Sequence, residues 1–419
     1  MMKKIVSLFL ALLLLTGILA SSSAEEEEEE ILLPDTPASE EAAQNISADC
    51  SWRFSTKKQN YKKWMTDGNF NTSWQKAKKT DGWIEITPKT PGQLIGSIYI
   101  CLDIQQDQWE LQVRYGDGWV TAWEGPSPYV HVFIPLDSPA EAVRFWFPKD
   151  TKRAKVAEIA AFSPGSTPSE VQIWEPTFEN ADILFLATHA DDELIFFGGG
   201  IPTYASEKKN KTVVAYLADC GARRTHELLN GLWSMGVRNY PVIAPFKDTA
   251  QKTMSKEYKE MGGQAAVRNW MVSLFRQVKP KVVVTHDVNG EYGHAQHKVC
   301  AAVAKIAYDA AADPSVDSAS AEAYGTWQVQ KLYLHLAKEN RITMDWSVPL
   351  SSLGGITGLD AAIRAFTFHV SQQEYDMNVT KTGKRYDNRI FGLVRTEVGP
   401  DEACDDFLEH IDLSSGQPE

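Results

Sequence analysis

The chain has little cysteine and a deficit of positive charge. Five cysteines (50, 101, 220, 300 and 404) in 419 residues are too few for a disulfide-rich scaffold. In an exported protein at least one of them stays unpaired, and Cys50 with Cys101 is a candidate bridge. Lys and Arg number 42 against 55 Asp and Glu, a formal net charge of −13. Proteins that bind a nucleic-acid backbone need clustered Lys and Arg, so this balance argues against nucleic acid as a partner.

Long apolar runs are missing beyond the N-terminus. Residues 5–19 form one apolar stretch, which follows Lys3 and Lys4 and gives way to small residues ending at Ala24. This pattern is typical of a secretory signal peptide. No later run reaches the ~20 apolar residues of a membrane span, and no cysteine follows the stretch where a lipid anchor would need one. We therefore expect residues 1–24 to be a signal peptide and the mature protein to be secreted.

An acidic, low-complexity segment follows. Glu25 to Glu30 are six consecutive glutamates, and Pro34, Pro37 and residues rich in Ala and Glu come after them. A segment of like charge cannot bury apolar surface. We expect residues 25–45 to be a disordered spacer.

Residues 46–165 alternate apolar and polar positions in short runs, for example 96–100, 109–113 and 143–147, with turns such as Gly116-Asp117-Gly118 between them. Many short strands with regular turns predict a β-sandwich. This segment holds eight of the thirteen tryptophans: Trp52, Trp64, Trp74, Trp83, Trp109, Trp119, Trp123 and Trp146. Exposed rings would stack on sugars, whereas buried rings would fill the core, and burial preferences favour the core for any single ring.

The segment from about 182 changes to strands alternating with longer helical stretches. The expected strands are 183–188, 212–218, 241–244, 281–285 and 331–336. Such alternation predicts an α/β fold with a mostly parallel, Rossmann-like sheet covered on both faces. Ligands of such sheets gather beyond the carboxyl ends of the strands. We place this second domain at residues 175–410.

A cluster of ligand-type residues follows the first of these strands, as His189-Ala190-Asp191-Asp192-Glu193, and a second follows the fourth strand, as His294-x-x-His297. A catalytic zinc site takes three protein ligands from imidazole and carboxylate groups and leaves one position for water. His189, Asp192 and His297 can supply those ligands. A bound divalent metal lowers the pKa of water towards ~7, and Asp191 is then the carboxylate that accepts its proton.

His294 and His297 lie three apart at the start of an expected helix, so both rings can face one pocket. We assign His297 to the metal and His294 to the oxyanion that forms on an attacked carbonyl. Taken alone, the first cluster could be only a helix cap, since Asp at a helix N-terminus accepts backbone N–H bonds. The second histidine pair makes a metal-dependent hydrolase the favoured interpretation.

These motifs resemble the PIG-L/LmbE deacetylase family, whose signature is an A-H-P-D-D-E turn after the first strand and a late H-x-D-H. This chain has T-H-A-D-D-E at 188–193 and H-A-Q-H at 294–297. The resemblance implies that His189, Asp192 and His297 hold zinc and that Asp191 is the general base, in agreement with the ligand chemistry. The departures Thr188, Ala190 and Ala295-Gln296 remove neither a ligand nor the base.

The same resemblance extends over residues 180–400 and implies further substrate-binding residues, namely Arg224, Tyr292 and His369. Arg224 either contacts substrate or forms an ion pair with Glu227 on one helix face. His369 follows an apolar helical run and is expected near the active site, behind the residues that touch the metal. His286 ends a strand, for which a structural role is favoured. The other histidines, His131, His226, His335 and His410, have no companions at useful spacing and are expected to be surface or packing residues.

A second resemblance concerns the N-terminal domain. Thr66-Asp67-Gly68-Asn69, Thr72-Ser73-Trp74 and Trp83-Ile84-Glu85-Ile86 look like the start of a discoidin-type (coagulation-factor C-like) jelly roll. That resemblance implies a glycan-binding module over residues 46–165.

Together these features predict a secreted enzyme that uses zinc, or another divalent metal, to remove the N-acetyl group from N-acetylglucosamine-type amino sugars in a glycan or glycoconjugate. Two alternatives stay open. One is a deacylase of a non-polymeric amino-sugar conjugate, and the other is a non-catalytic glycan-binding protein.

Overall fold

The computed structural model describes residues 41–56, 60–375, 378–379 and 384–414, all within the unit Ser39–Glu419. The expected signal peptide and residues 25–40 of the expected spacer lie outside the described residues. Where the spacer is described, the expectation was wrong, because Ala42 bridges Ser166 and Asn45 bridges Phe162. None of the described helices is long and apolar enough to cross a membrane.

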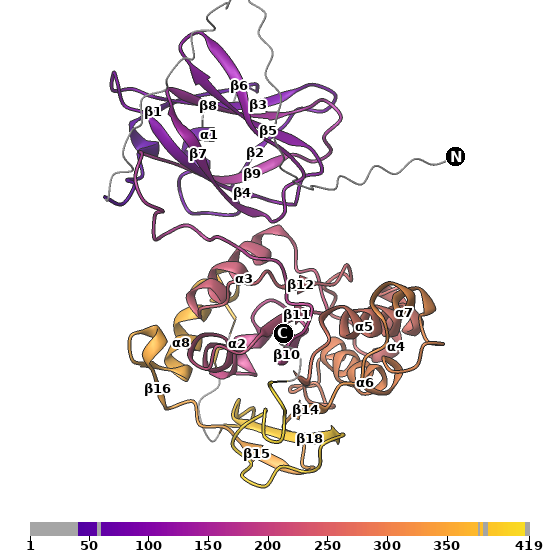
Figure 1. Cartoon of the computed structure of the whole chain (residues 1–419). Helices are drawn as coiled ribbons and strands as arrows, with labels where there is room; N and C mark the ends of the chain where they lie inside the picture. The colour runs from indigo at the N-terminus through magenta and orange to yellow at the C-terminus, as the bar shows by residue number, and fades with distance from the viewer. Residues whose placement is uncertain (1–40, 57–59, 376–377, 380–383, 415–419) are drawn as a thin grey trace, which may run out of the picture. The chain divides into compact units, whose positions relative to one another are not determined.

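The N-terminal part is a sandwich of two antiparallel sheets, drawn in indigo to magenta in Figure 1. One sheet has the order β1-β3-β8-β5-β6 and the other β2-β9-β4-β7. The strands are β1 (Cys50–Phe54), β2 (Trp74–Gln75), β3 (Gly82–Pro88), β4 (Ile95–Leu102), β5 (Trp109–Tyr115), β6 (Gly118–Gly125), β7 (His131–Ala140), β8 (Ala142–Phe147) and β9 (Lys155–Phe162). A short helix, α1 (Tyr61–Trp64), and a 3-10 turn, Ser47–Asp49, complete it.

Alternation along the strands explains this sandwich. In β5, Trp109, Leu111 and Val113 are buried and the residues between them are not. Successive side chains of a strand point to opposite faces, so one face of each sheet supplies the core. The predicted β-sandwich is confirmed.

The C-terminal part contains a seven-stranded sheet of order β12-β11-β10-β13-β14-β18-β15. Its strands are β10 (Ile183–Ala187), β11 (Thr212–Tyr216), β12 (Val242–Ile243), β13 (Val282–Thr285), β14 (Lys331–His335), β15 (Arg341–Thr343) and β18 (Ile390–Thr396). The pairs from β12 to β14 are parallel, whereas β18 pairs antiparallel with β14 and β15. The expected α/β class is confirmed, and the antiparallel edge is an addition that the sequence did not predict.

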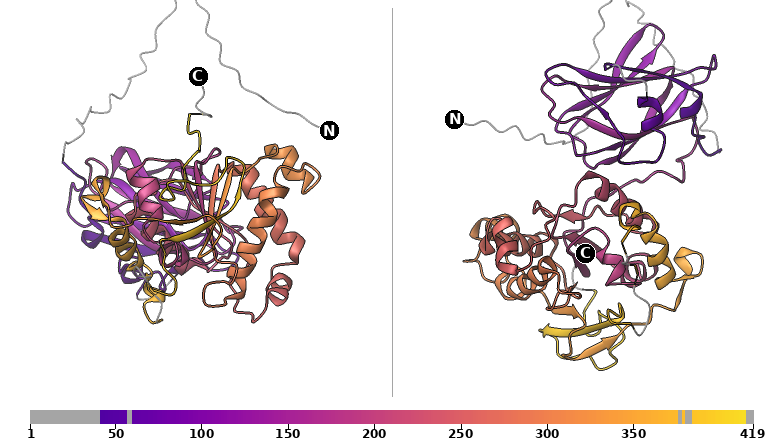
Figure 2. Two further views of the ribbon diagram at one scale, coloured as in Figure 1. Left: turned by 90° about the horizontal axis from the view of Figure 1, so that it is seen from below. Right: turned by 180° about the vertical axis from the view of Figure 1, so that it is seen from behind.

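Helices cover both faces of this sheet (Figure 2). Leu184 and Leu186 of β10 pack with α5 and α6, while Ile183, Phe185 and Ala187 pack with α2, α3 and α8. The helices are α2 (Asp192–Ile195), α3 (Ala222–Ser234), α4 (Met254–Glu260), α5 (Gln264–Val278), α6 (Ala295–Ala310), α7 (Ser318–Tyr324) and α8 (Gly358–Phe366). A π-helix, Pro202–Glu207, 3-10 turns at Ser351–Leu353 and Val370–Gln372, and a small hairpin of β16 (Pro349–Leu350) and β17 (Ile356–Thr357) complete it.

The direction of the chain reverses across the sheet between β10 and β13. From β10 the chain moves outward to β11 and β12, then returns to the other side of β10 for β13 and β14. Ligands of open parallel sheets bind where the strand order reverses, beyond the carboxyl ends of the strands. Both histidine motifs follow the two strands that flank this point.

The cysteines form no disulfide. All five, including Cys50 and Cys101, are free, so the candidate bridge between these two was wrong. Both side chains are buried, and each fills core space as a small apolar group.

Candidate active site

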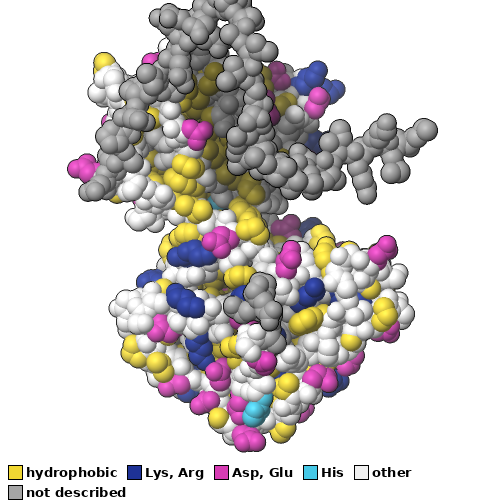
Figure 3. Space-filling model, in the orientation of Figure 1, with side chains coloured by type: hydrophobic (Ala, Val, Ile, Leu, Met, Phe, Trp, Pro, Cys, Tyr) yellow, Lys and Arg dark blue, Asp and Glu magenta, His cyan; other side chains and the backbone are white. Residues whose placement is uncertain are grey.

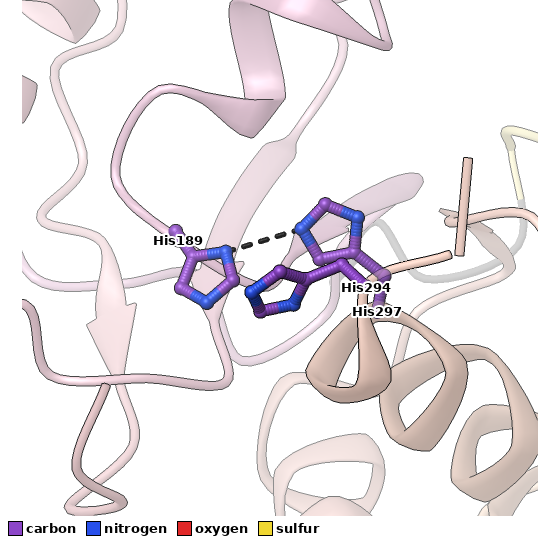
Figure 4. Close-up of side chains that lie close together, drawn as sticks. All are labelled: His189, His294 and His297. Atoms are coloured by element: carbon purple, nitrogen blue, oxygen red, sulfur yellow. Dashed lines mark hydrogen bonds between the residues drawn. The ribbon is translucent and has the colours of Figure 1, made fainter. Parts of the chain in front are cut away.

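The two histidine motifs meet at the carboxyl ends of β10 and β13. His189 lies in the turn between β10 and α2, and His294 is the N-cap residue of α6. β10 and β13 are paired in parallel, so their ends lie at the same edge of the sheet. Figure 4 shows the rings of His189, His294 and His297 gathered at one point, although the motifs are more than a hundred residues apart.

Three donor atoms converge in this cluster. His189 Nδ1 lies 3.1 Å from Asp192 Oδ2 and 3.1 Å from His297 Nε2. His297 Nε2 is also 3.1 Å from Asp192 Oδ2. All three residues are buried. Lone pairs this close repel one another unless a proton or a metal ion lies between them, and a tetrahedral zinc with bonds of about 2.0–2.1 Å separates its ligand atoms by about 3.3 Å. The donor set therefore fits zinc in type and in spacing.

Hydrogen bonds on the far side of each ring orient the inner nitrogen towards Asp192. His189 Nε2 donates to Gln296 Oε1 at 2.8 Å, and Gln296 is held by its own amide, which donates to Lys247 O at 3.0 Å. His297 Nδ1 donates to Glu291 Oε2 at 2.8 Å. The neutral form of an imidazole, which is the form that binds metal, has one N–H, so in that form both rings present a lone pair towards Asp192.

His286 offers a competing ligand set with Asp192 and His297. However, His286 Nε2 accepts a 2.9 Å hydrogen bond from the Thr188 N–H. Its lone pair is thus already in use, and it lies farther from Asp192 Oδ2, at 3.5 Å. The geometry favours His189 over His286 as the third donor.

Asp191 lies beside this cluster on the cavity side. Burial and the neighbouring Asp192 raise the pKa of Asp191 to about 7, against the lowering effect of Arg224. Its Oδ1 accepts a 3.0 Å bond from Arg224 Nη2. Its backbone has a φ of 144°, a conformation that L-residues rarely adopt, and its N–H donates to Glu193 Oε2 at 2.9 Å. Strain of this kind persists only where the surroundings hold it, and it is common at active sites.

His294 is half-buried beside His189 and His297. The three rings have centroid separations of 4.7 to 5.1 Å. Burial and the two neighbouring imidazoles lower the pKa of His294 to about 3, so its ring is neutral at neutral pH. Its Nδ1 is buried and has no hydrogen-bond partner among the described residues. A neutral ring with one N–H can donate to a substrate oxygen.

A cavity of about 360 Å³ opens over these groups. Its lining residues are His189, Asp191, Asp192, Ile195, Arg224, Asp248, Ala250, Tyr292, His294, Gln372 and Tyr375. The expected substrate residues Arg224 and Tyr292 are both among them. The alternative pairing of Arg224 with Glu227 was wrong, because Arg223 forms that pair at 3.0 Å, whereas Arg224 Nη1 contacts Asp248 Oδ2 at 3.2 Å.

His369 is placed differently from the expectation of a substrate-binding residue. Its side chain is fully buried, with Nε2 3.6 Å from Glu193 Oε1, and it is not part of the cavity lining. The ring sits against Gly231 of α3, where a Cβ would lie 3.2 Å from Nε2. The apolar end of α8 turns the residue inward, and Gln372 and Tyr375 of the following segment reach the cavity instead.

Several residues of the site were missed by sequence reasoning. Glu291 accepts hydrogen bonds from three histidines, and one of them is His335, which was expected to be a surface or packing residue. Asp248 lies 3.6 Å from His189 Nε2. Glu291 had a detectable signal, since it stands between two glycines and precedes the histidine pair. Asp248 and His335 had none, because only the fold brings them close.

Charged side chains of both signs lie on the face of the protein that Figure 3 shows. Figure 3 shows Lys and Arg interspersed with Asp and Glu on the visible face of the C-terminal part.

Known proteins are similar to this chain over the same residues. Residues 184–308 match the GlcNAc-PI de-N-acetylase family, PIG-L. The 1D-myo-inositol 2-acetamido-2-deoxy-alpha-D-glucopyranoside deacetylase of Geodermatophilus obscurus is 27% identical over 184 residues, which are 36% of this chain and 60% of that protein. The enzyme of the same name from Rhodococcus erythropolis is 31% identical over 36% of this chain and 59% of that protein. The chain thus spans about 60% of the length of these relatives.

Solved structures are similar at lower identity. N,N'-diacetylchitobiose deacetylase from Pyrococcus horikoshii is 16% identical, covers 47% of this chain and 72% of its own, and has a TM-score of 0.36. A family 32 carbohydrate-binding module of C. perfringens NanJ, solved with galactose, is 15% identical, covers 29% of this chain and 97% of its own, and has a TM-score of 0.25. The family match over residues 184–308 confirms the resemblance drawn from the two histidine motifs.

Proposed function

We propose that this protein is a secreted, zinc-dependent N-deacetylase of N-acetylglucosamine-type amino sugars. One observation carries the proposal. His189 Nδ1, Asp192 Oδ2 and His297 Nε2 converge at 3.1 Å from one another, with the Asp191 carboxylate beside them at the floor of a cavity. Three metal ligands, with a neighbouring carboxylate that does not bind the metal, are the arrangement of a metal-dependent hydrolase.

The residues of the chain then have distinct tasks. A divalent metal, when bound, supplies acidification of water and polarisation of the amide carbonyl. Asp191 takes the proton of the attacking water and returns it to the departing amine, a task for which a pKa of about 7 is suited. Neutral His294 donates a hydrogen bond to the oxygen that becomes negative as the carbonyl is attacked.

Arg224 and Tyr292 border the cavity and hold the sugar. Arg224 is fixed by Ala190 O at 2.6 Å and by Asp191 and Asp248, and it is one of the residues that line the cavity. Tyr292 is about half exposed, at 49%. The volume of about 360 Å³ lies in the range of small-ligand sites and suits one sugar unit better than several.

The substrate class is supported by the names of the relatives. These enzymes remove an acetyl group from an amino sugar joined to inositol. Because the chain spans about 60% of them, the inositol part is not carried over to this protein. The amide on the amino sugar is the shared chemistry.

We further propose that the sandwich, residues 46–165, binds glycan through its outer sheet face. Trp83, Trp119 and Trp146 are partly exposed there, on β3, β6 and β8. Arg144 lies 3.9 Å from the centre of the Trp119 ring and 5.9 Å from that of Trp83. Partly exposed rings flanked by arginines offer stacking and hydrogen bonding together.

We also infer that the second domain is Rossmann-like, because the order of the strands around β10 reverses as it does in such folds.

The test is release of acetate and free amine from N-acetylglucosamine and its oligomers by the purified protein lacking residues 1–24. The protein is first treated with a chelator, and zinc is then restored in steps. We expect no release after chelation and recovery at one zinc per chain. Zinc binding at one per chain without release from any N-acetylated sugar would contradict the proposed substrate class.

A further inference from the structure

A buried carboxylate joins three histidines behind the candidate metal ligands. Glu291 Oε1 accepts from His286 Nδ1 at 3.1 Å, from His335 Nδ1 at 3.1 Å and from the Asp287 N–H at 3.0 Å. Its other oxygen, Oε2, accepts from His297 Nδ1 at 2.8 Å. The side chains of Glu291 and of the three histidines are 0% exposed.

The backbone at Glu291 is in an unfavourable conformation. Its φ is 51°, in the left-handed region that favours glycine. A non-glycine residue in this conformation is strained. A glutamate held in this conformation and buried with four donors around it indicates that its side chain has a task that glycine or a small residue would not fulfil.

The carboxylate determines which nitrogen of each ring carries hydrogen. An ionised carboxylate only accepts hydrogen bonds, so every ring nitrogen that faces it must carry a proton. For His286 this agrees with the other side of the ring, because Nε2 accepts from the Thr188 N–H at 2.9 Å. For His297 it leaves Nε2 as a lone pair, and that atom is the one 3.1 Å from His189 Nδ1 and Asp192 Oδ2.

We propose that Glu291 is a positioning residue that fixes His297 as the Nδ1–H tautomer and so gives the site its affinity for metal. The inference rests on the proposed metal site and deepens it. Carboxylates that orient metal-bound histidines raise metal affinity in general. Here the Glu291 carboxylate also accepts hydrogen bonds from two further histidines, His286 at the end of β13 and His335 at the end of β14. These two strands therefore hold the carboxylate in place, and the carboxylate orients the His297 ring.

Glu291→Gln is the sharpest variant because it keeps the shape and removes one acceptor. The Oε1 position receives three donors, so the glutamine oxygen belongs there and its NH₂ group faces His297 Nδ1. That nitrogen must then accept, which moves the ring proton to Nε2, the atom that faces Asp192. We expect zinc affinity to fall by about 10–100-fold.

Two measurements test this without using activity. Zinc affinity of the apoprotein is measured by competition with a chromophoric chelator. The tautomer of His297 is read from imidazole ¹H–¹⁵N correlation spectra of the labelled apoprotein, assigned with a His297→Asn variant. In the metal-free protein, against the lowering effect of burial, Asp192 and Glu291 raise the pKa of His297 to about 10, so the spectra are recorded above that pH, where the ring is neutral. There we expect the wild type to show the Nδ1–H form and Glu291→Gln the Nε2–H form. Unchanged affinity with an unchanged tautomer in Glu291→Gln would overturn the proposal.

Two variants separate positioning from a loss of stability. Glu85→Gln alters another buried carboxylate, which pairs with Arg53 at 3.0 Å and Arg144 at 2.9 Å in the sandwich, and should leave zinc affinity unchanged. His335→Gln removes one donor to Glu291 but keeps the bond to His297, so it should lower thermal stability and retain near wild-type zinc affinity. If zinc affinity fell as much in His335→Gln as in Glu291→Gln, Glu291 would act through the stability of the protein and not by positioning His297.

The outcomes also separate this inference from the proposed function. Wild-type protein that binds zinc in a Glu291-dependent manner but releases no acetate would retain the positioning role and refute the substrate. Acetate release by the wild type together with wild-type zinc affinity in Glu291→Gln would support the proposed substrate and refute the positioning role of Glu291.

Discussion

The tryptophans of the sandwich and the histidines of the α/β part are both conspicuous in the sequence, but the fold uses them in different ways. Trp74 and Trp109 are fully buried and pack against other aromatic rings. His297 and His335 are buried just as deeply, yet both nitrogens of each ring face a polar partner. In this protein the buried tryptophans of the sandwich belong to its core, whereas the buried histidines around Asp192 and Glu291 belong to the candidate site.

The difference follows from the free energy of burial. An indole ring gains from leaving water over most of its surface. An imidazole has two polar nitrogens, and burying either without a partner costs about 1–3 kcal/mol. Four buried histidines around two carboxylates, Asp192 and Glu291, form a network that apolar packing alone would not select.

The largest effect is expected at Asp191. Asp191→Asn keeps the size of the side chain and removes its ability to take a proton, so the rate of amide hydrolysis should fall by about 10²–10⁴-fold. Zinc content should stay at the wild-type level, because Asp191 is not one of the three converging donors. Steady-state acetate release and metal analysis of the same preparation measure both.

A matched control is Asp192→Asn, which alters a donor and should reduce zinc binding and activity together. If Asp191→Asn hydrolysed the substrate at the wild-type rate, Asp191 would have no part in proton transfer, and the histidine cluster would have to be explained without it.

The second effect concerns the core of the sandwich. The Trp109 ring is 0% exposed and has centroid distances of 4.3 Å to Trp123 and 5.9 Å to Phe145. Trp109→Ala should lower the free energy of unfolding by about 3–5 kcal/mol. Denaturant unfolding followed by circular dichroism measures this loss, and Trp109→Phe should recover most of it. A loss below about 1 kcal/mol would show that the ring is not part of the core.

The sequence predicted the α/β part well where spacing was the evidence. His189 and Asp192 lie in one short turn, and His294 and His297 lie one helical turn apart, so local geometry alone brings each pair together. A parallel sheet then places both turns at one edge. For these residues, short-range structure and one rule about strand ends were sufficient.

Other residues depended on tertiary structure. Asp248 and His335 reach the cluster from different strand ends, and no local pattern marks them. His369 was assigned to substrate through the family resemblance. Its ring lies instead against Gly231 of α3 and beside Glu193, which agrees with the expected place behind the residues that touch the metal. In the sandwich, the sequence shows many tryptophans but does not tell which of them face the core and which face solvent, because that depends on strand register.

The third effect is on the pH dependence of stability and involves a carboxyl group of the sandwich. Burial and the nearby Asp67 raise the pKa of Glu158 from 4.5 to about 8. Between these values the folded state holds a proton that the unfolded state has released, so the Glu158 contribution to stability is complete below pH 4.5 and decreases as the pH rises to about 8.

Glu158→Gln removes this titration. We expect the difference in unfolding free energy between variant and wild type to grow in favour of the variant from pH 5 to pH 8, as followed by denaturant unfolding at each pH. A difference that is constant over this range would mean that Glu158 is ionised in the folded protein at all these pH values.

The smallest effect is expected at Trp119, on the outer sheet face. Its ring is partly exposed and lies 3.9 Å from the Arg144 guanidinium and 5.6 Å from that of Arg114. Trp119→Ala should therefore lower the free energy of unfolding by only about 0.5–1 kcal/mol, the contribution of an exposed cation–π contact. It should weaken binding to an N-acetylglucosamine polymer and leave hydrolysis of a short substrate unchanged. If Trp119→Ala destabilised the protein as much as Trp109→Ala, the outer tryptophans would belong to the structure rather than to a glycan surface.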